Sequence, residues 1–261
     1  MISVIFITGY VTIRVRMKKL SINAFTLKII AVISMIIDHF AASGLLRKYF
    51  PFGWFGLGYR STYRIFRILG RFAFPIYCFL LIEGIRHTRD WRKYALRLFL
   101  FALLSEIPFD MAFRHTFFEY GHQNVYFTLF LGLLPVVYLQ RSKQEKPLRY
   151  LYYAAMVGIS ACLAHWVFHC DYRAGGIVQI GIFGLLSDTT TDRLRNLVLG
   201  VAGILACCLI LRSTTETYAL LSLLLISCYN GKKGPSGEIL KYTFYIIYPV
   251  HLFLFGWLFM H

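Results

Sequence analysis

The sequence predicts an all-α fold, a polytopic bundle of transmembrane helices. Of the 261 residues, 58% are hydrophobic and only 15% are charged, which is far from the composition of an ordinary soluble domain. Apolar segments recur along the whole chain and are separated by short basic loops. No polar stretch is long enough to fold separately, so we expect a cytoplasmic segment at residues 1–24 and one integral membrane domain at residues 25–261.

About nine spans (eight to ten) are predicted from the apolar segments, because a helix needs about 20 apolar residues to cross the hydrocarbon core. Several segments are shorter than this. An odd number of spans places the two termini on opposite sides of the membrane. The predicted spans are residues 27–46, 64–85, 94–113, 124–140, 149–167, 174–187, 196–211, 217–230 and 239–259.

The distribution of Lys and Arg predicts the orientation of these spans. Of the 28 basic residues, 18 lie in segments on the side of the N-terminus and 8 lie in loops on the opposite side. The positive-inside rule therefore predicts a multi-pass protein of a bacterial inner membrane, with a cytoplasmic N-terminus and an external C-terminus. Five of the eight external cations lie between residues 47 and 67, a region rich in aromatic residues and Gly that is interpreted as an interfacial segment or, alternatively, a binding loop.

The net charge of +16 has the same explanation, because loop cations set topology and attract anionic headgroups. Membrane lipids are thus expected partners, and nucleic acid is not. The six cysteines form no C-x-x-C pair and are interpreted as small apolar core residues. His165 and His169 have a spacing that can hold zinc, but the Glu of a metalloprotease motif is missing, so no metal is expected.

The most informative span is residues 27–46, because Asp38 and His39 stand near its middle. A charged group at that depth costs at least about 2.5–3.5 kcal/mol. We therefore expect these two side chains either to pair within the bundle or to perform chemistry in a polar cavity. A histidine is well suited to proton transfer, because its charge changes easily near neutral pH.

Other polar residues of the spans fall at a similar depth, between the membrane midplane and the external surface. Scattered residues of one depth predict a single polar site. The members of this set are Asp38, His39, Arg71, Glu106, Asp110, Asn124, Asp171 and His251.

Each of these residues also has a structural interpretation. Asp38 and Arg71 form a plausible ion pair, and His251 alone is consistent with a satisfied core histidine. Glu106 and Asp110 share a helix face at i, i+4, which requires a shared proton or a cation from Arg71 or Arg97.

Five segments, taken in order, resemble the TraX family over residues 25–256. The segments are LKIIAVISMIIDHF, ILGRFAFPIYCFLLIEGIRHTRDWRKYALRLFLFALLSEIPFDM, QNVYFTLFLGLL, DYRAGGIVQIGIFGLL and YIIYPVHLFLF. The family takes its name from the conjugative-pilus protein that acetylates the N-terminus of F-type pilin. The chain also resembles, more distantly, the integral-membrane acyltransferases, which take acyl groups from a cytoplasmic donor such as acetyl-CoA and modify sugars, lipids or peptides.

The resemblance implies a membrane acyltransferase that moves an acetyl or acyl group from cytoplasmic acetyl-CoA to an amine or hydroxyl. The acceptor is left open, as a peptide N-terminus, a glycan or a lipid. His39 is expected to act as general base, and Arg71 to stabilise the developing oxyanion. The expected catalytic residues are His39, Asp38, Arg71, Glu106 and His251, and the expected substrate or cavity residues are Asp110, Asn124 and Asp171.

A basic cluster in a cytoplasmic loop suits the phosphates of coenzyme A, because arginine forms charge-assisted, often bidentate contacts with phosphate. The cluster consists of Arg86, Arg89, Arg92 and Lys93. Its alternative interpretation is a loop that only sets topology.

Two other classes of protein remain open. A proton-coupled transporter also carries intramembrane Asp, Glu and His, although the two halves of this chain show none of the repeat symmetry that many transporters have. The third class is a non-catalytic membrane assembly factor, but a role of this kind does not explain the buried Asp-His pair.

Overall fold

A computed structural model describes residues 2–7, 10–15, 21–186 and 193–261 of the chain. In the N-terminal part, β1 (Ile2–Ile7) pairs antiparallel with β2 (Tyr10–Val15), and Ile2 lies opposite Val15. This hairpin lies in the predicted N-terminal segment, outside the helical bundle, and it follows from the many β-branched residues of this stretch, which favour extended backbone. Residues 16–20, which belong to the predicted cytoplasmic segment 1–24, lie outside the described residues.

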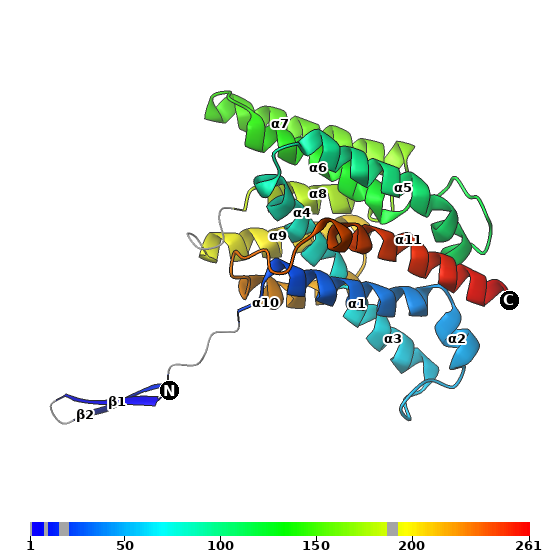
Figure 1. Ribbon diagram of the computed structural model, residues 1–261, viewed down its shortest axis with the longest axis horizontal. Helices are drawn as coiled ribbons and strands as arrows, with labels where there is room; N and C mark the ends of the chain where they lie inside the picture. The colour runs from blue at the N-terminus through cyan, green and yellow to red at the C-terminus, as the bar shows by residue number, and fades with distance from the viewer. Residues whose placement is uncertain (1, 8–9, 16–20, 187–192) are drawn as a thin grey trace.

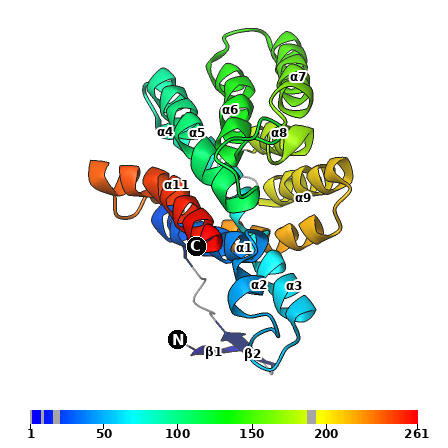
Figure 2. The same cartoon turned by 90° about the vertical axis from the view of Figure 1, so that its right-hand side faces the viewer.

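The rest of the described chain is a helical bundle, in which the long helices run roughly side by side (Figures 1 and 2). Helix α11 packs along α5, α8 packs along α9, and α1 packs against both α3 and α4. The elements are α1 (Ala24–Ala42), α2 (Leu45–Tyr49), α3 (Tyr59–Gly70), α4 (Ala73–His87), α5 (Trp91–Phe113), α6 (Val125–Arg141), α7 (Lys146–Cys162), the π-helix η1 (Leu163–Val167), α8 (Arg173–Gly184), α9 (Arg193–Leu211), the 3₁₀-helix η2 (Thr215–Leu221), α10 (Ser222–Ser227) and α11 (Glu238–Met260).

Within the described residues, five helical segments are long and apolar enough to cross a membrane. They are Ala24–Ala42, Tyr59–His87, Lys146–Val167, Arg193–Leu211 and Glu238–Met260.

The predicted count of nine spans is thus not reached by length and composition. The predicted span at 174–187 contains α8, which has only 12 residues. The one at 217–230 is divided between η2 and α10. The structure supports the coarser prediction, a helical protein with several apolar helices long enough to cross a membrane.

The predicted span 64–85 is interrupted at Arg71, because α3 ends at Gly70 and α4 begins at Ala73. The Ser34 hydroxyl on α1 donates to the carbonyls of Leu69 (2.6 Å) and Gly70 (3.2 Å) at this break. A Cβ atom on Gly70 would lie only 2.2 Å from the Cβ of Asp38. Glycine therefore lets α3 approach α1 at the very position of the buried carboxylate.

Helix α4 forms the centre of the bundle and is buried along almost its whole length. It packs against α1, α6, α8 and α10, and a helix that is apolar all round is expected at such a position. The outer helices instead expose leucines, among them Leu104 on α5, Leu151 on α7 and Leu209 on α9. Exposed apolar surface of this kind suits contact with lipid.

Candidate functional site

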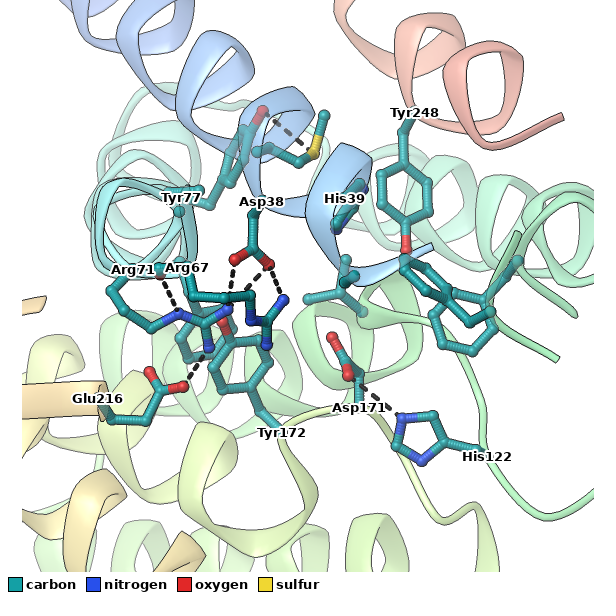
Figure 3. Close-up of a pocket in the computed structure, with 18 of the residues that line it drawn as sticks. Asp38, His39, Arg67, Arg71, Tyr77, His122, Asp171, Tyr172, Glu216 and Tyr248 are labelled. Atoms are coloured by element: carbon teal, nitrogen blue, oxygen red, sulfur yellow. Dashed lines mark hydrogen bonds and ion pairs between the residues drawn. The ribbon is translucent and has the colours of Figure 1, made fainter. Parts of the chain in front are cut away.

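One end of the bundle encloses a partly open cavity of about 400 Å³. Its walls come from the second half of α1, the α3–α4 junction, the C-terminal end of α5, the start of α6, the turn before α8, η2 and α11 (Figure 3). Four residues of the predicted site line it, namely Asp38, His39, Arg71 and Asp171. The structure therefore brings four of the eight predicted polar residues together at one cavity.

A buried network of two carboxylates and two arginines forms one wall (Figure 3). The Nη2 of Arg71 donates to both oxygens of Asp38 at 2.8 Å, and its Nη1 donates to Glu216 on η2. Its Nε donates to the backbone carbonyl of Arg67 at 3.1 Å. The predicted Asp38–Arg71 ion pair is confirmed, and the network as a whole engages every nitrogen of the Arg71 guanidinium.

Arg67 completes this wall in a different manner. Its Nη1 donates to Asp38 at 2.8 Å, and the described residues provide no partner for its Nε or Nη2. About a quarter of its side chain is exposed, and it lines the cavity. Arg67 is therefore the cation of this network that retains N–H groups for a ligand.

A pair of histidines joins α1 to α11 beside the cavity. The Nδ1 of His39 lies 2.7 Å from the Nε2 of His251, and the Nδ1 of His251 lies 2.7 Å from the backbone carbonyl of Ile247. The two imidazole rings are nearly parallel, with centroids 5.0 Å apart.

This geometry fixes the tautomers of both rings in their neutral forms. A carbonyl only accepts, so the Nδ1 of His251 carries the proton and its Nε2 is an acceptor. The Nδ1 of His39 must then donate to His251, which leaves the Nε2 of His39 with a free lone pair. His39 lines the cavity, so the arrangement presents an oriented base to whatever binds there.

The opposite wall carries a histidine–carboxylate contact, between the Nε2 of His122 and Asp171 at 3.2 Å (Figure 3). Next to it, Tyr172 stacks on Phe74 with ring centroids 3.6 Å apart. Burial raises the pKa of Tyr172 well above its ordinary value, and Glu216 raises it further. Tyr172 is therefore a neutral phenol at physiological pH, available as a hydrogen-bond donor rather than as a base.

Four predicted site residues lie outside the cavity lining, namely Glu106, Asp110, Asn124 and His251. The Oε1 of Glu106 accepts from the backbone N–H and the side-chain amide of Asn124, both at 3.0 Å. Asn124 also caps α6 by accepting from the N–H of Tyr126 and donates to the carbonyl of Ala102 on α5. The contacts of Glu106 and Asn124 fasten the start of α6 to α5.

Asp110 is likewise absent from the cavity lining, and its Oδ2 accepts from the backbone N–H of Glu119 at 2.8 Å. The expectation that Arg71 or Arg97 neutralises Glu106 and Asp110 was wrong. Arg71 is engaged elsewhere, and the guanidinium of Arg97 lies over the ring of Tyr94. The spacing of residues along the sequence does not show which group an arginine side chain contacts on another helix.

The predicted coenzyme A cluster lies at the other end of α4. Arg86 is bonded to Glu83 at 2.8 Å and to the carbonyl of Leu186, so it is largely committed to the fold. Arg89, Arg92 and Lys93 are exposed, and Lys93 has a weak contact with Asp90 at 3.8 Å. The three exposed cations are thus the ones free to meet a phosphate.

The structure offers little support for metal or cysteine chemistry at the site. Among the described residues, no group of three or more His, Cys, Asp or Glu is placed to hold a metal ion. His165 lies in η1, whereas His169 follows it with a φ of 49°, so the two are not successive turns of one helix. Cys170 is fully buried, and burial raises the pKa of its thiol to about 12.

Three cavity residues escaped the sequence analysis as site residues: Arg67, His122 and Glu216. Arg67 carried the clearest signal, because it stands four residues before Arg71 and therefore on the same helix face. His122 directly precedes the Gln-Asn pair that opens α6. Glu216 is one of only 12 acidic residues in the chain, and its partner, Arg71, lies 145 residues away.

Comparisons with known proteins identify relatives of the whole chain. The model of the family described as TraX protein matches residues 24–259. The chain is similar to a probable fimbrial assembly protein, FimC of serogroup H1, from Dichelobacter nodosus. The identity is 27% over 265 residues, covering 91% of this chain and 96% of the relative. No solved structure is detectably similar.

Proposed function

Because the chain belongs to the TraX family, we propose that it is an integral-membrane acyltransferase that transfers an acetyl group from acetyl-CoA to an amine or hydroxyl. The observation that carries the proposal is the oriented, neutral His39 facing a polar cavity. Acyl transfer needs a base of this kind at the nucleophile.

In this mechanism, the Nε2 of His39 takes the proton from the acceptor as its nitrogen or oxygen attacks the thioester carbonyl. The resulting imidazolium keeps its Nδ1 hydrogen bond to His251, which is in turn fixed by the carbonyl of Ile247. When the carbon–sulfur bond breaks, the same proton passes from His39 to the departing thiolate. The products are the acetylated acceptor and free coenzyme A, so atoms and charges balance.

Arg67 is assigned the oxyanion that develops on the thioester carbonyl. It has free N–H groups facing the cavity, whereas those of Arg71 are engaged by Asp38, Glu216 and the Arg67 carbonyl. Arg71 then has a positioning role, since it holds the Asp38 carboxylate to which Arg67 is anchored. Preoriented donors of this kind are often the largest single contribution to catalysis.

The donor is proposed to approach from the cytoplasmic side, with its phosphates at Arg89, Arg92 and Lys93. Arg86 lies 12 positions after Phe74, which lines the cavity, and this separation corresponds to about 18 Å along α4. A long, thin donor is required to bridge such a distance, and the pantetheine arm of coenzyme A has that shape. This assignment assumes the topology that we also propose, namely nine spans in a bacterial inner membrane with a cytoplasmic N-terminus and an external C-terminus.

A role in the assembly of a surface structure is a second candidate, favoured by the name of the fimbrial relative. The two candidates are compatible if the acceptor is a protein that is exported or assembled. The polar cavity with its oriented histidine favours a catalytic contribution to assembly over a purely structural one.

Acetyl labelling of membranes tests the proposal. Membranes from cells with and without the protein are incubated with acetyl-CoA that carries a radioactive acetyl group, and incorporation into lipid, glycan and protein fractions is compared. We expect incorporation that requires the protein and is lost in His39→Ala. Equal incorporation in both membranes refutes the acyltransferase.

A further inference from the structure

The helix that leads into the cavity carries four arginines on one face. Arg60, Arg64 and Arg67 on α3 and Arg71, the residue that caps its C-terminus, follow one another at intervals of four, three and four residues, which places them on a single side. We refer to these four residues as the arginine ladder. Arg60 and Arg64 are exposed, Arg67 is half-buried and Arg71 is buried, so the ladder descends from the surface to the cavity wall.

The two ends of the ladder differ in how their charges are compensated. Arg67 and Arg71 are paired with Asp38 and Glu216. In contrast, no Asp or Glu of residues 21–186 and 193–261 forms an ion pair with Arg60 or Arg64. Arg64 has only a 3.3 Å contact with the hydroxyl of Tyr218 on η2. Two uncompensated cations therefore stand directly outside the cavity.

An apolar surface accompanies these cations. The loop before α3 exposes Phe52 (92%) and Phe55 (84%). It is fixed to the first turn of α3 because the Trp54 N–H donates to the hydroxyl of Thr62, and that hydroxyl donates to the carbonyl of Gly58. Aromatic and cationic groups are thus held side by side, an arrangement that suits a molecule with an apolar part and an anionic part.

We propose that the outer two arginines of the ladder, Arg60 and Arg64, recognise an anionic group of the acceptor, which is therefore an anionic amphiphile. The inference rests on the proposed function and names the acceptor class for the same cavity. Along the helix axis, Arg64 lies about 4.5 Å and Arg60 about 10 Å from Arg67. A phosphate or carboxylate held by the outer two arginines then lies about 5–10 Å along the helix axis from Arg67, which lines the same cavity as His39.

Binding of short-chain lipids to the full-length protein in a neutral detergent tests this inference. The probes are phosphatidylglycerol and phosphatidylcholine with the same acyl chains, which differ in net charge but not in their apolar part. We expect the wild type to prefer phosphatidylglycerol by about tenfold, and the preference to weaken at high salt, because exposed charges are screened. The variant Arg60→Gln/Arg64→Gln should lose this preference.

The matched control is Arg89→Gln/Arg92→Gln, which removes the same charge at the other end of the bundle and should keep the preference. If inorganic phosphate competes with phosphatidylglycerol, the result supports recognition of the phosphate group itself. If phosphatidylglycerol is preferred but phosphate does not compete, the result supports recognition of an anion carried by a lipid. Equal affinity of the wild type for both lipids overturns the proposal, as does an unchanged preference in Arg60→Gln/Arg64→Gln. This assay measures binding and does not depend on acetyl transfer. If the lipid preference is found but acetyl labelling is not, the proposed function fails while recognition of an anion by Arg60 and Arg64 stands.

Discussion

Replacing His251 by Phe tests the histidine pair most sharply, because it keeps an aromatic ring and removes the acceptor of the His39 N–H. The 2.7 Å hydrogen bond between the two rings is neutral at rest and becomes charge-assisted once His39 has taken the proton. A hydrogen bond to a charged group contributes about 1.5–3 kcal/mol. Its loss in the transition state corresponds to a decrease in kcat/KM of between about tenfold and about 150-fold.

The assay is the initial rate of acetyl incorporation into membranes at varied acetyl-CoA, with the amount of folded protein measured in parallel. His251→Gln is the matched variant, because its amide oxygen can accept from His39, and we expect partial recovery. His39→Ala should decrease the rate by about 10²–10⁴-fold. Adding His251→Phe to it should change nothing further, since the two rings act as one unit.

Wild-type kcat/KM in a folded His251→Phe protein refutes the assigned tautomer chain. A double variant that is much slower than His39→Ala also refutes it, because His251 would then act independently of His39.

Three further substitutions separate structural from catalytic roles. Arg71→Gln should lower the free energy of unfolding by about 3–5 kcal/mol, because it leaves the buried Glu216 without its cation and Asp38 with Arg67 alone; an unchanged melting temperature in detergent would contradict this. Glu106→Gln should keep near wild-type kcat, because its amide oxygen still accepts from Asn124, and a hundredfold loss with normal stability would restore a catalytic role. Arg89→Gln/Arg92→Gln should raise the KM for acetyl-CoA with little change in kcat, and an unchanged KM would mean that the donor is held elsewhere.

The sequence predicted the parts of the fold that depend on composition and on buried charge. Its composition indicated a helical membrane protein, and the family resemblance was confirmed by the match over residues 24–259. The isolated charge of Asp38 in an apolar span required a partner, and Arg71 was the basic residue available at that depth. Burial energetics alone therefore sufficed for this pair.

The remaining features depend on packing between helices, which no single segment contains. The break at Arg71 lies directly after the close approach of Gly70 to Asp38, which is a property of two helices together. Glu106 and Asp110 share a helix face as predicted from their spacing, yet their partners come from the loop before α6. Likewise, the tautomer of His39 is set by a backbone carbonyl of α11 more than 200 residues away.

The central claim is that the cavity transfers an acetyl group, and the stoichiometry of the reaction tests it most directly. Membrane vesicles that contain the wild type or His39→Ala are given acetyl-CoA on the cytoplasmic face only, and released coenzyme A thiol and membrane-bound acetyl groups are counted together. The account predicts one thiol released for each acetyl group retained, with neither product formed by His39→Ala. Thiol release without retained acetyl groups, or retained acetyl groups that do not depend on His39, would contradict it.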